Sequence, residues 1–566
     1  MFLIFLSWIY IVFTSVNCGV WTEKILGLKN RNTVVTSILG LFSITLIASI
    51  WAVFGRINIE FHVVLLLFNL VIYYKFRRAI NTSYNLFWQH ILALSGALQT
   101  FLVLITLLIL AQCSTLPYVI DNESYYIQTI KWLNEYGFVK GLANLHLYLG
   151  QFSGWHITQS VFNLSFLYPN FNDLSGYCLL LGVLFSIEKL QLYYKNRTLI
   201  FLITGVFTFG SIYYFQFISA PSPDIAIYVL TFIILFYFIE NYKNCSSEVF
   251  NLIVALVLFM LYIKSTSIVF AILPLVLFLQ NFKNLIKNLI IPSLLAGIVL
   301  VLFITKNMIV SGSVFFPSKL FESFAADYSI PKTIESNYYD AIRYFGYRVN
   351  ANQFQEMSTI ELLINWLSMP KLNGVFNKIG LSIIAIVPFF IYKYQNKKSF
   401  WIVYLLMVFQ MALLFATSPQ YRFFMNFVLF FSFFCFVCLI RNQKVIITLL
   451  YFSLVPIGFT LFIPMQLSYF TSNTFMSKTN TFPLKALLFP LENTKLGNDF
   501  EVFELGNLKY NSPLDNDFFY GTGNGALPCV NKKQIDYYQR NYDIIPQMRT
   551  NDIKDGFYSK NLLKNE

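Results

Sequence analysis

The sequence predicts an all-α protein that crosses a membrane many times. Hydrophobic residues make up 57% of the 566 residues, charged residues only 12%, and the mean hydropathy is +0.60. Soluble globular chains carry about 25% charged residues, roughly twice this share. The apolar residues are also gathered into long runs, and a helix of about 20 apolar residues spans a bilayer. These observations exclude a soluble enzyme and indicate a polytopic membrane protein.

The apolar runs predict about fourteen membrane spans. The first run has no Lys or Arg before it, unlike a secretory signal, so we expect it to be kept as a membrane helix. The predicted spans cover approximately residues 1–20, 34–55, 59–74, 88–111, 174–192, 198–217, 224–240, 248–263, 266–280, 286–305, 376–392, 399–417, 423–440 and 445–466.

Basic clusters support this order because they fall in every second loop. The clusters are Lys24/Lys29/Arg31, Lys75/Arg77/Arg78, Lys189/Lys195/Arg197, Lys243, Lys283/Lys287, Lys393/Lys397/Lys398 and Arg441/Lys444. Positive charge marks cytoplasmic loops, so the net charge of +13 is a topology signal and does not indicate nucleic-acid binding. All long loops then lie on the outer face. We expect a transmembrane domain over 1–466, with large outer loops at 117–172 and 306–372, followed by a small outer-face segment over 467–566.

The first outer loop contains the main candidate for chemistry, Asp121. Tyr125, Thr129, Trp132 and Tyr136 recur at helical spacing, which predicts a short amphipathic helix along the membrane surface. Asp121 precedes its first turn and has two interpretations. It is either the N-cap of this helix or a general base that accepts a proton from an attacking hydroxyl.

A second acid, Asp224, ends the sequence Pro-Ser-Pro-Asp and opens a predicted span. Ser-Pro-Asp is a good helix start, which is one interpretation. The other is an outer-face carboxylate that holds donor hydroxyls, the acceptor or a divalent cation. Two carboxylates with a lipid phosphate can bind Mg²⁺ or Mn²⁺, although a donor with a single phosphate does not require a metal.

Three cations, Lys264, Lys306 and Arg422, stand at the outer ends of predicted spans. They either extend to the lipid headgroups or bind a phosphate. The planar fork of Arg422 can hold phosphate through two hydrogen bonds, which makes it the best phosphate ligand. His146 and His156 lie in the first outer loop, where hydrogen bonding to sugar hydroxyls or to the loop backbone is a simpler role than metal ligation.

The first outer loop resembles that of the GT-C superfamily of membrane glycosyltransferases, which includes protein mannosyltransferases and lipid A aminoarabinose transferases. The shared features are an acid closely followed by Tyr after a membrane helix, and an interfacial helix after it. More narrowly, DNESYYIQTIKWLNEYGFVKGLANLHLYLGQFSGWH is similar to a family of uncharacterised bacterial multipass membrane proteins. That similarity continues in ISAPSPDIAI, IKSTSI, KNMIVSGSVFFP, DYSIPK, SPQYRFF and GALPCV, in a consistent order along the chain.

The resemblance implies a GT-C-like helix bundle. It also implies a transfer reaction that inverts the configuration at the anomeric carbon of the sugar. The donor would be a polyprenyl-phosphate sugar, and the acceptor an outer-face glycan, lipid or protein. It assigns the base to Asp121. The residues that we expect to bind the sugar or the phosphate are Asp224, Lys264, Lys306, Arg422, His146 and Tyr125. The acid that follows, Glu123, departs from the superfamily pattern and is a rival base. The expected location is a bacterial inner membrane, with the site on the periplasmic face.

Two other functions fit part of the same sequence. A polysaccharide polymerase or ligase also joins lipid-linked glycans on the outer face, but would rely on Arg and His rather than on Asp121. A lipid-glycan flippase or transporter also needs many helices, yet transporters often carry inverted repeats and charges near the midplane. The sequence has no evident internal repeat, and its candidate polar residues lie at one face. This pattern favours an enzyme.

Overall fold

The computed structural model describes residues 1–29, 32–168, 173–318, 326–497, 499–514 and 517–563. Within these ranges twelve helices are long and apolar enough to cross a membrane, or up to thirteen if a bent pair, Ser265–Gln280 with Phe282–Asn288, is one span. The twelve are α1 (Phe2–Leu26), α2 (Thr33–Phe54), α3 (Ile59–Leu92), α4 (Gly96–Cys113), α8 (Leu174–Asn196), α9 to α10 (Leu199–Ile218), α11 (Pro223–Asn241), α15 (Ile290–Ser311), α19 (Lys371–Tyr394), α20 (Lys398–Ala416), α21 (Tyr421–Leu439) and α22 (Gln443–Phe462).

The predicted fold class is confirmed, because the chain is a mainly helical, multi-pass membrane protein. The predicted number of spans is higher than twelve or thirteen. One reason is α12 (Ser247–Ile263), which has 17 residues and is shorter than the other spans. The other is the predicted span 266–280, which belongs to the bent pair with an angle of 95° at its break.

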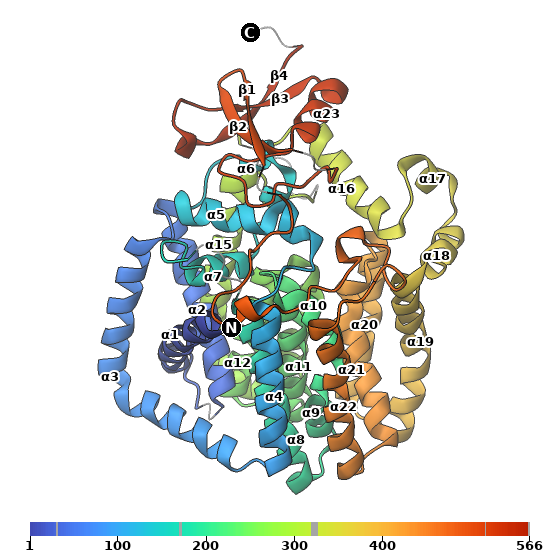
Figure 1. Ribbon diagram of the computed structural model, residues 1–566. Helices are drawn as coiled ribbons and strands as arrows, with labels where there is room; N and C mark the ends of the chain where they lie inside the picture. Colours follow the sequence, from blue (N-terminus) through green and yellow to red (C-terminus); the bar gives the residue numbers. More distant parts are fainter. Residues whose placement is uncertain (30–31, 169–172, 319–325, 498, 515–516, 564–566) are drawn as a thin grey trace.

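One boundary differs from the prediction for a physical reason. The sequence predicted a span over 88–111, but α3 continues to Leu92 and α4 begins at Gly96. α3 has a non-helical residue at Phe76, and beyond this kink it crosses the lower end of the bundle in Figure 1. Lys75, Arg77 and Arg78 lie at the kink, where cationic side chains are best placed near headgroups and water.

The segments between the spans gather mainly at the opposite end, which we call the loop face (Figure 1). It carries a π-helical turn at Asn122–Tyr126 and several short helices. These are α5 (Ile127–Glu135), α6 (Leu142–Leu145), α7 (Gly154–Phe162), α16 (Lys332–Tyr347), α17 (Ala351–Glu356) and α18 (Thr359–Leu367).

The bent pair of helices described above includes two short α-helices, α13 (Ile272–Gln280) and α14 (Phe282–Leu285).

The C-terminal segment covers part of the loop face with a small mixed structure. Strands β1 (Phe500–Leu505) and β2 (Leu508–Pro513) form one antiparallel pair, and β3 (Ile544–Met548) and β4 (Phe557–Asn561) form another, with α23 (Lys532–Tyr542) between the pairs. Its buried residues join cores that other segments share. Ile544, for example, packs in one cluster with Leu147 and Tyr338.

The predicted helix after Asp121 is present as α5, but it is not a surface helix. Most of its side chains are buried, and Trp132 is fully enclosed. The C-terminal segment covers this helix, and Gln128 and Lys131 donate hydrogen bonds to its carbonyl groups at Gly523, Asn524 and Gly525. The amphipathic pattern therefore arose from packing against protein on more than one side.

Candidate functional site

Four charged side chains from distant segments meet at the loop face. The guanidinium Nη1 of Arg422 lies 2.6 Å from Oδ2 of Asp121 and 3.9 Å from Oδ2 of Asp224. The Lys264 ammonium donates to Oδ1 of Asp224. We call Asp121, Asp224, Lys264 and Arg422 the charge network. It contains two positive and two negative groups, so it is balanced as a whole.

The local structure of each acid leaves its carboxylate available to the network. Ser222 caps α11 by accepting from the Asp224 backbone N–H, with Pro223 in the first turn. The capping role predicted for the Ser-Pro-Asp sequence therefore falls to serine, and the Asp224 side chain can pair with Lys264. Asp121 precedes the π-helical turn, but its side chain makes no capping hydrogen bond and pairs with Arg422 instead.

Arg422 is held from several sides. Its Nε donates to Gln420 Oε1 at 3.2 Å, and its backbone carbonyl accepts from the Tyr228 hydroxyl at 2.8 Å. The ring of Phe423 lies beneath both cations, 5.0 Å from the guanidinium carbon and 4.2 Å from Lys264 Nζ. An aromatic face stabilises nearby cations electrostatically. This support lets two positive charges lie close together.

The four side chains of the charge network differ in their exposure to solvent. Asp224 is only 3% exposed, whereas Asp121, Arg422 and Lys264 are exposed by 20%, 23% and 20%. Burial lowers the pKa of the Lys264 ammonium from its ordinary value, and the adjacent Asp224 carboxylate opposes that shift. Asp224 is therefore a sealed partner for the cations, while Asp121 and Arg422 can be reached by a ligand.

Aromatic rings continue from the network towards the C-terminal segment. The half-buried Tyr125 stacks on Tyr148, with ring centres 5.2 Å apart and an angle of 12°. Tyr148 in turn meets the edge of Tyr520 at 4.7 Å. Burial is the main cause that raises the pKa of Tyr125 well above its usual value, so this phenol stays protonated. Tyr125 is thus a neutral hydroxyl beside the charges.

The two loop histidines are buried and neutral. Burial lowers the pKa of His146 to about 4 and that of His156 to about 3. A ring nitrogen of His146 lies 3.1 Å from the backbone carbonyl of Tyr520, which belongs to the C-terminal segment and not to the loop. The His156 ring packs against Tyr126 at 4.5 Å and Tyr125 at 5.8 Å.

Two predicted site residues have other contacts. Glu123 is fully buried and accepts hydrogen bonds from the Thr494 hydroxyl and, at 3.0 Å, from the Lys495 backbone N–H. The Lys306 ammonium is 3% exposed and donates to the Phe152 carbonyl. Within the described ranges, no hydrogen bond or ion pair joins Glu123 or Lys306 to the charge network. The structure thus brings together four of the predicted residues and separates these two from them.

Sequence reasoning missed the residues that support the network and those that hold the aromatic rings and Glu123 beside it. Tyr228 and Gln420 lie next to predicted site residues, and their polar groups at helix ends could have marked them. Tyr148 lies in the same loop as His146, but its stacking on Tyr125 requires the fold. Tyr520 and Thr494 lie in the C-terminal segment, where no sequence signal connects them to Asp121.

A divalent cation at the network would have to share carboxylates that already pair with the two cations. In the described part of the chain no group of three or more His, Cys, Asp or Glu side chains is placed to hold a metal ion. Mg²⁺ is commonly bound by one or two carboxylates together with a substrate phosphate, so Asp121 and Asp224 are the residues that would hold it.

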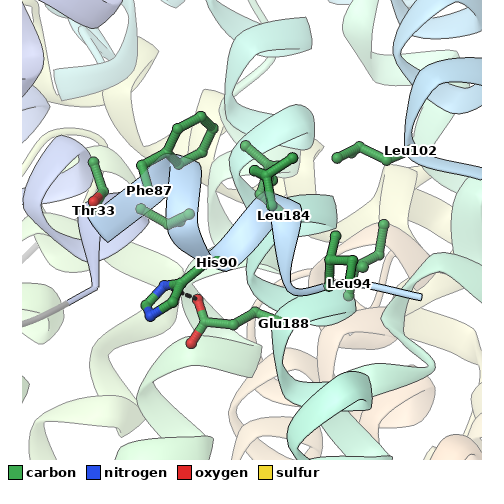
Figure 2. Close-up of a pocket in the computed structure, with 10 residues that line it drawn as sticks. Thr33, Phe87, His90, Leu94, Leu102, Leu184 and Glu188 are labelled. Atoms are coloured by element: carbon green, nitrogen blue, oxygen red, sulfur yellow. Dashed lines mark ion pairs between the residues drawn. The ribbon is translucent and has the colours of Figure 1, made fainter. Parts of the chain in front are cut away.

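A separate small cavity lies away from this network, beside the second half of α3 and α8 (Figure 2). Figure 2 shows His90 and Glu188 side by side at its wall, with Nδ1 and Oε2 3.9 Å apart. Its volume of about 20 Å³ has room for roughly one water molecule. Glu188 is already paired with Lys189 at 2.8 Å, so this cavity is a packing feature.

The fold and the charge network define a multi-pass membrane protein with a charged site at one face of its helix bundle. The chain belongs to the family described as a domain of unknown function, DUF8201, whose model matches residues 1–429. The matched range includes the whole charge network and ends before the C-terminal segment. No curated protein and no solved structure matches the chain.

Proposed function

We propose that this protein is an inverting GT-C-type glycosyltransferase that uses a polyprenyl-phosphate sugar as donor. The observation that carries the proposal is the convergence of Asp121, Asp224 and Arg422 at one face of the bundle. Such a transfer needs a base for the acceptor hydroxyl and fixed cations for the leaving phosphate. The charge network supplies both within hydrogen-bonding distance.

In the proposed reaction the acceptor hydroxyl gives its proton to Asp121 as its oxygen bonds to the anomeric carbon. The bond from that carbon to the phosphate oxygen breaks at the same time, and its electron pair leaves with polyprenyl phosphate. Arg422 and Lys264 neutralise the charge on that phosphate. Because these cations are already in place, no large rearrangement is needed as the charge develops.

The contacts of the two candidate bases favour Asp121. Asp121 is partly exposed and touches the arginine that would bind the leaving group. Both carboxylate oxygens of Glu123 accept hydrogen bonds, from Asn122, Thr494 and Lys495, in a fully buried position. Glu123 therefore ties the C-terminal segment to the loop, and in our proposal it takes no part in proton transfer.

The proposal also assigns the surroundings of the enzyme. In the proposal the loop face lies outside the cytoplasm, at the periplasmic face of a bacterial inner membrane, and the basic loops at the other end support this orientation. The donor would be drawn from membrane lipids, and the acceptor would be an envelope glycan, a lipid or a protein. The half-buried rings of Tyr125 and Tyr148 offer faces on which a sugar ring can pack.

The test is transfer of a labelled sugar from polyprenyl-phosphate donors to endogenous acceptors in membranes. Membranes containing wild-type protein, Asp121→Asn or Glu123→Gln are compared at matched expression. We expect transfer by wild type and Glu123→Gln and a loss of at least about 100-fold in Asp121→Asn, in line with removal of general-base catalysis. Equal transfer by Asp121→Asn would remove it as the base. No protein-dependent transfer with any donor would favour the polymerase, ligase or flippase.

A further inference from the structure

We propose that Arg422 is a switch that keeps Asp121 inactive until a lipid phosphate binds. Without donor, the guanidinium holds the Asp121 carboxylate. The donor phosphate then takes the guanidinium and releases Asp121 to act as a base. This inference rests on the proposed function, because it concerns the regulation of the same site. Its consequence is an ordered reaction in which the donor binds before the acceptor loses its proton.

The Arg422–Asp121 contact occupies an oxygen of the proposed base. At 2.6 Å it is a short charge-assisted hydrogen bond, among the strongest that side chains make. Oδ2 of Asp121 is therefore occupied by the guanidinium, and this contact must open before that oxygen can take the proton of an acceptor hydroxyl.

The balance of charge in the network allows a phosphate to take the place of Asp121. Arg422, Lys264, Asp121 and Asp224 sum to zero. A polyprenyl-phosphate sugar carries one negative charge on its phosphate diester. When that phosphate replaces Asp121, the two cations are balanced by Asp224 and the phosphate. Asp121 is then without a cation partner in the network and is free to act as the base of the proposed reaction.

The contacts around Arg422 fix most of its side chain while phosphate replaces Asp121 as its partner. Gln420 holds Nε and Tyr228 holds the backbone carbonyl, so only the outer end of the guanidinium needs to change partners. Asp224 stays fixed by Lys264 and remains 3.9 Å from Nη1. Asp121 makes no capping bond in its own turn, which leaves its side chain free to rotate after release. The arginine fork suits phosphate, which accepts two hydrogen bonds from it.

The experiment measures how readily Asp121 reacts with a water-soluble carbodiimide and an amine. Labelled positions are read by mass spectrometry of the purified full-length protein in detergent micelles. The micelles contain no added lipid, a polyprenyl phosphate, the uncharged polyprenol of equal length, or inorganic phosphate. The exchange predicts a rise of about 5-fold or more in Asp121 labelling with polyprenyl phosphate, and no rise with polyprenol. Buried Glu123 is the internal control and should not change.

Each outcome decides between the alternatives. A rise with inorganic phosphate as well would support the exchange and assign recognition to the phosphate alone. An equal rise with polyprenol, or no rise with polyprenyl phosphate, would overturn it. In Arg422→Gln, labelling should be high without lipid and should not respond to it. Arg422→Lys serves if the glutamine variant does not fold, and its response should be smaller than that of wild type.

The labelling needs no sugar transfer, so it separates this inference from the proposed function. A rise in labelling without transfer of any sugar would keep the exchange and remove the glycosyltransferase. Transfer without a rise in labelling would do the reverse.

Discussion

Arg422 and Asp121 form an ion pair with a 2.6 Å contact across a sequence separation of 301 residues. Arg422 lies in the first turn of α21, and Asp121 lies in the first large loop. The pair therefore joins two parts of the chain at the site. Both lie within the range that the family model matches. In our proposals this contact keeps Asp121 occupied and positions Arg422 to bind a phosphate.

Replacing Arg422 should separate charge from geometry. The proposed reaction predicts that Arg422→Gln lowers the rate of sugar transfer by about 100- to 1000-fold, because the leaving phosphate would lose its main stabilising donor. Arg422→Lys should recover part of this, since it restores the charge without the planar fork. The rates are measured with labelled donor at saturating acceptor. Full activity in the lysine variant would show that bidentate binding is not required.

The Asp224–Lys264 pair predicts a loss of stability that a second substitution reverses. Asp224→Asn leaves the Lys264 ammonium largely buried without its nearest carboxylate, and breaking a buried pair costs about 3 kcal/mol. Thermal unfolding in detergent should show the loss. The double variant Asp224→Asn with Lys264→Met should regain most of it. Additive losses in the double variant would argue against a direct pair.

Glu123 predicts a pH dependence of stability. Burial raises its pKa above the ordinary value of 4.5, although hydrogen bonds from Thr494 and Lys495 oppose the shift. The folded state therefore holds this proton more strongly than the unfolded state. Its contribution to stability is present at low pH and is lost as the pH rises above about 4.5 and through the raised pKa. Unfolding temperatures should thus fall with pH more steeply in wild type than in Glu123→Gln. Parallel curves would contradict this reading.

Lys131 should control the docking of the C-terminal segment. Its ammonium donates to the carbonyls of Asn524 and Gly525, each at 2.9 Å. In Lys131→Met we expect faster proteolysis within residues 517–531, by up to about 30-fold, because these carbonyls lose charged donors worth about 2 kcal/mol. Lys509→Met, which removes an exposed ion pair with Glu504, is the matched control and should leave the rate unchanged. Equal cleavage in both variants would show that the Lys131 contacts do not hold the segment.

Parts of the site could be predicted from sequence because polar residues are conspicuous among apolar spans. Asp224, Lys264 and Arg422 each stand at the end of a predicted span, and Asp121 lies in the first long loop, so the predicted topology brings them to one face. The same face also includes Glu123 and Lys306, which have separate contacts with Thr494 and Phe152. Being at the same face did not decide which side chains meet.

The sequence by itself determined the fold class, most of the helices and the common face of the long loops. Lipid imposes these locally, since every backbone polar group in the bilayer must be satisfied within its own helix and basic loops mark one side. Only the tertiary structure decided that Arg422 meets Asp121, that Glu123 turns to Thr494, and that the C-terminal segment covers α5. These contacts depend on packing between segments hundreds of residues apart, and no local pattern of residues specifies that packing.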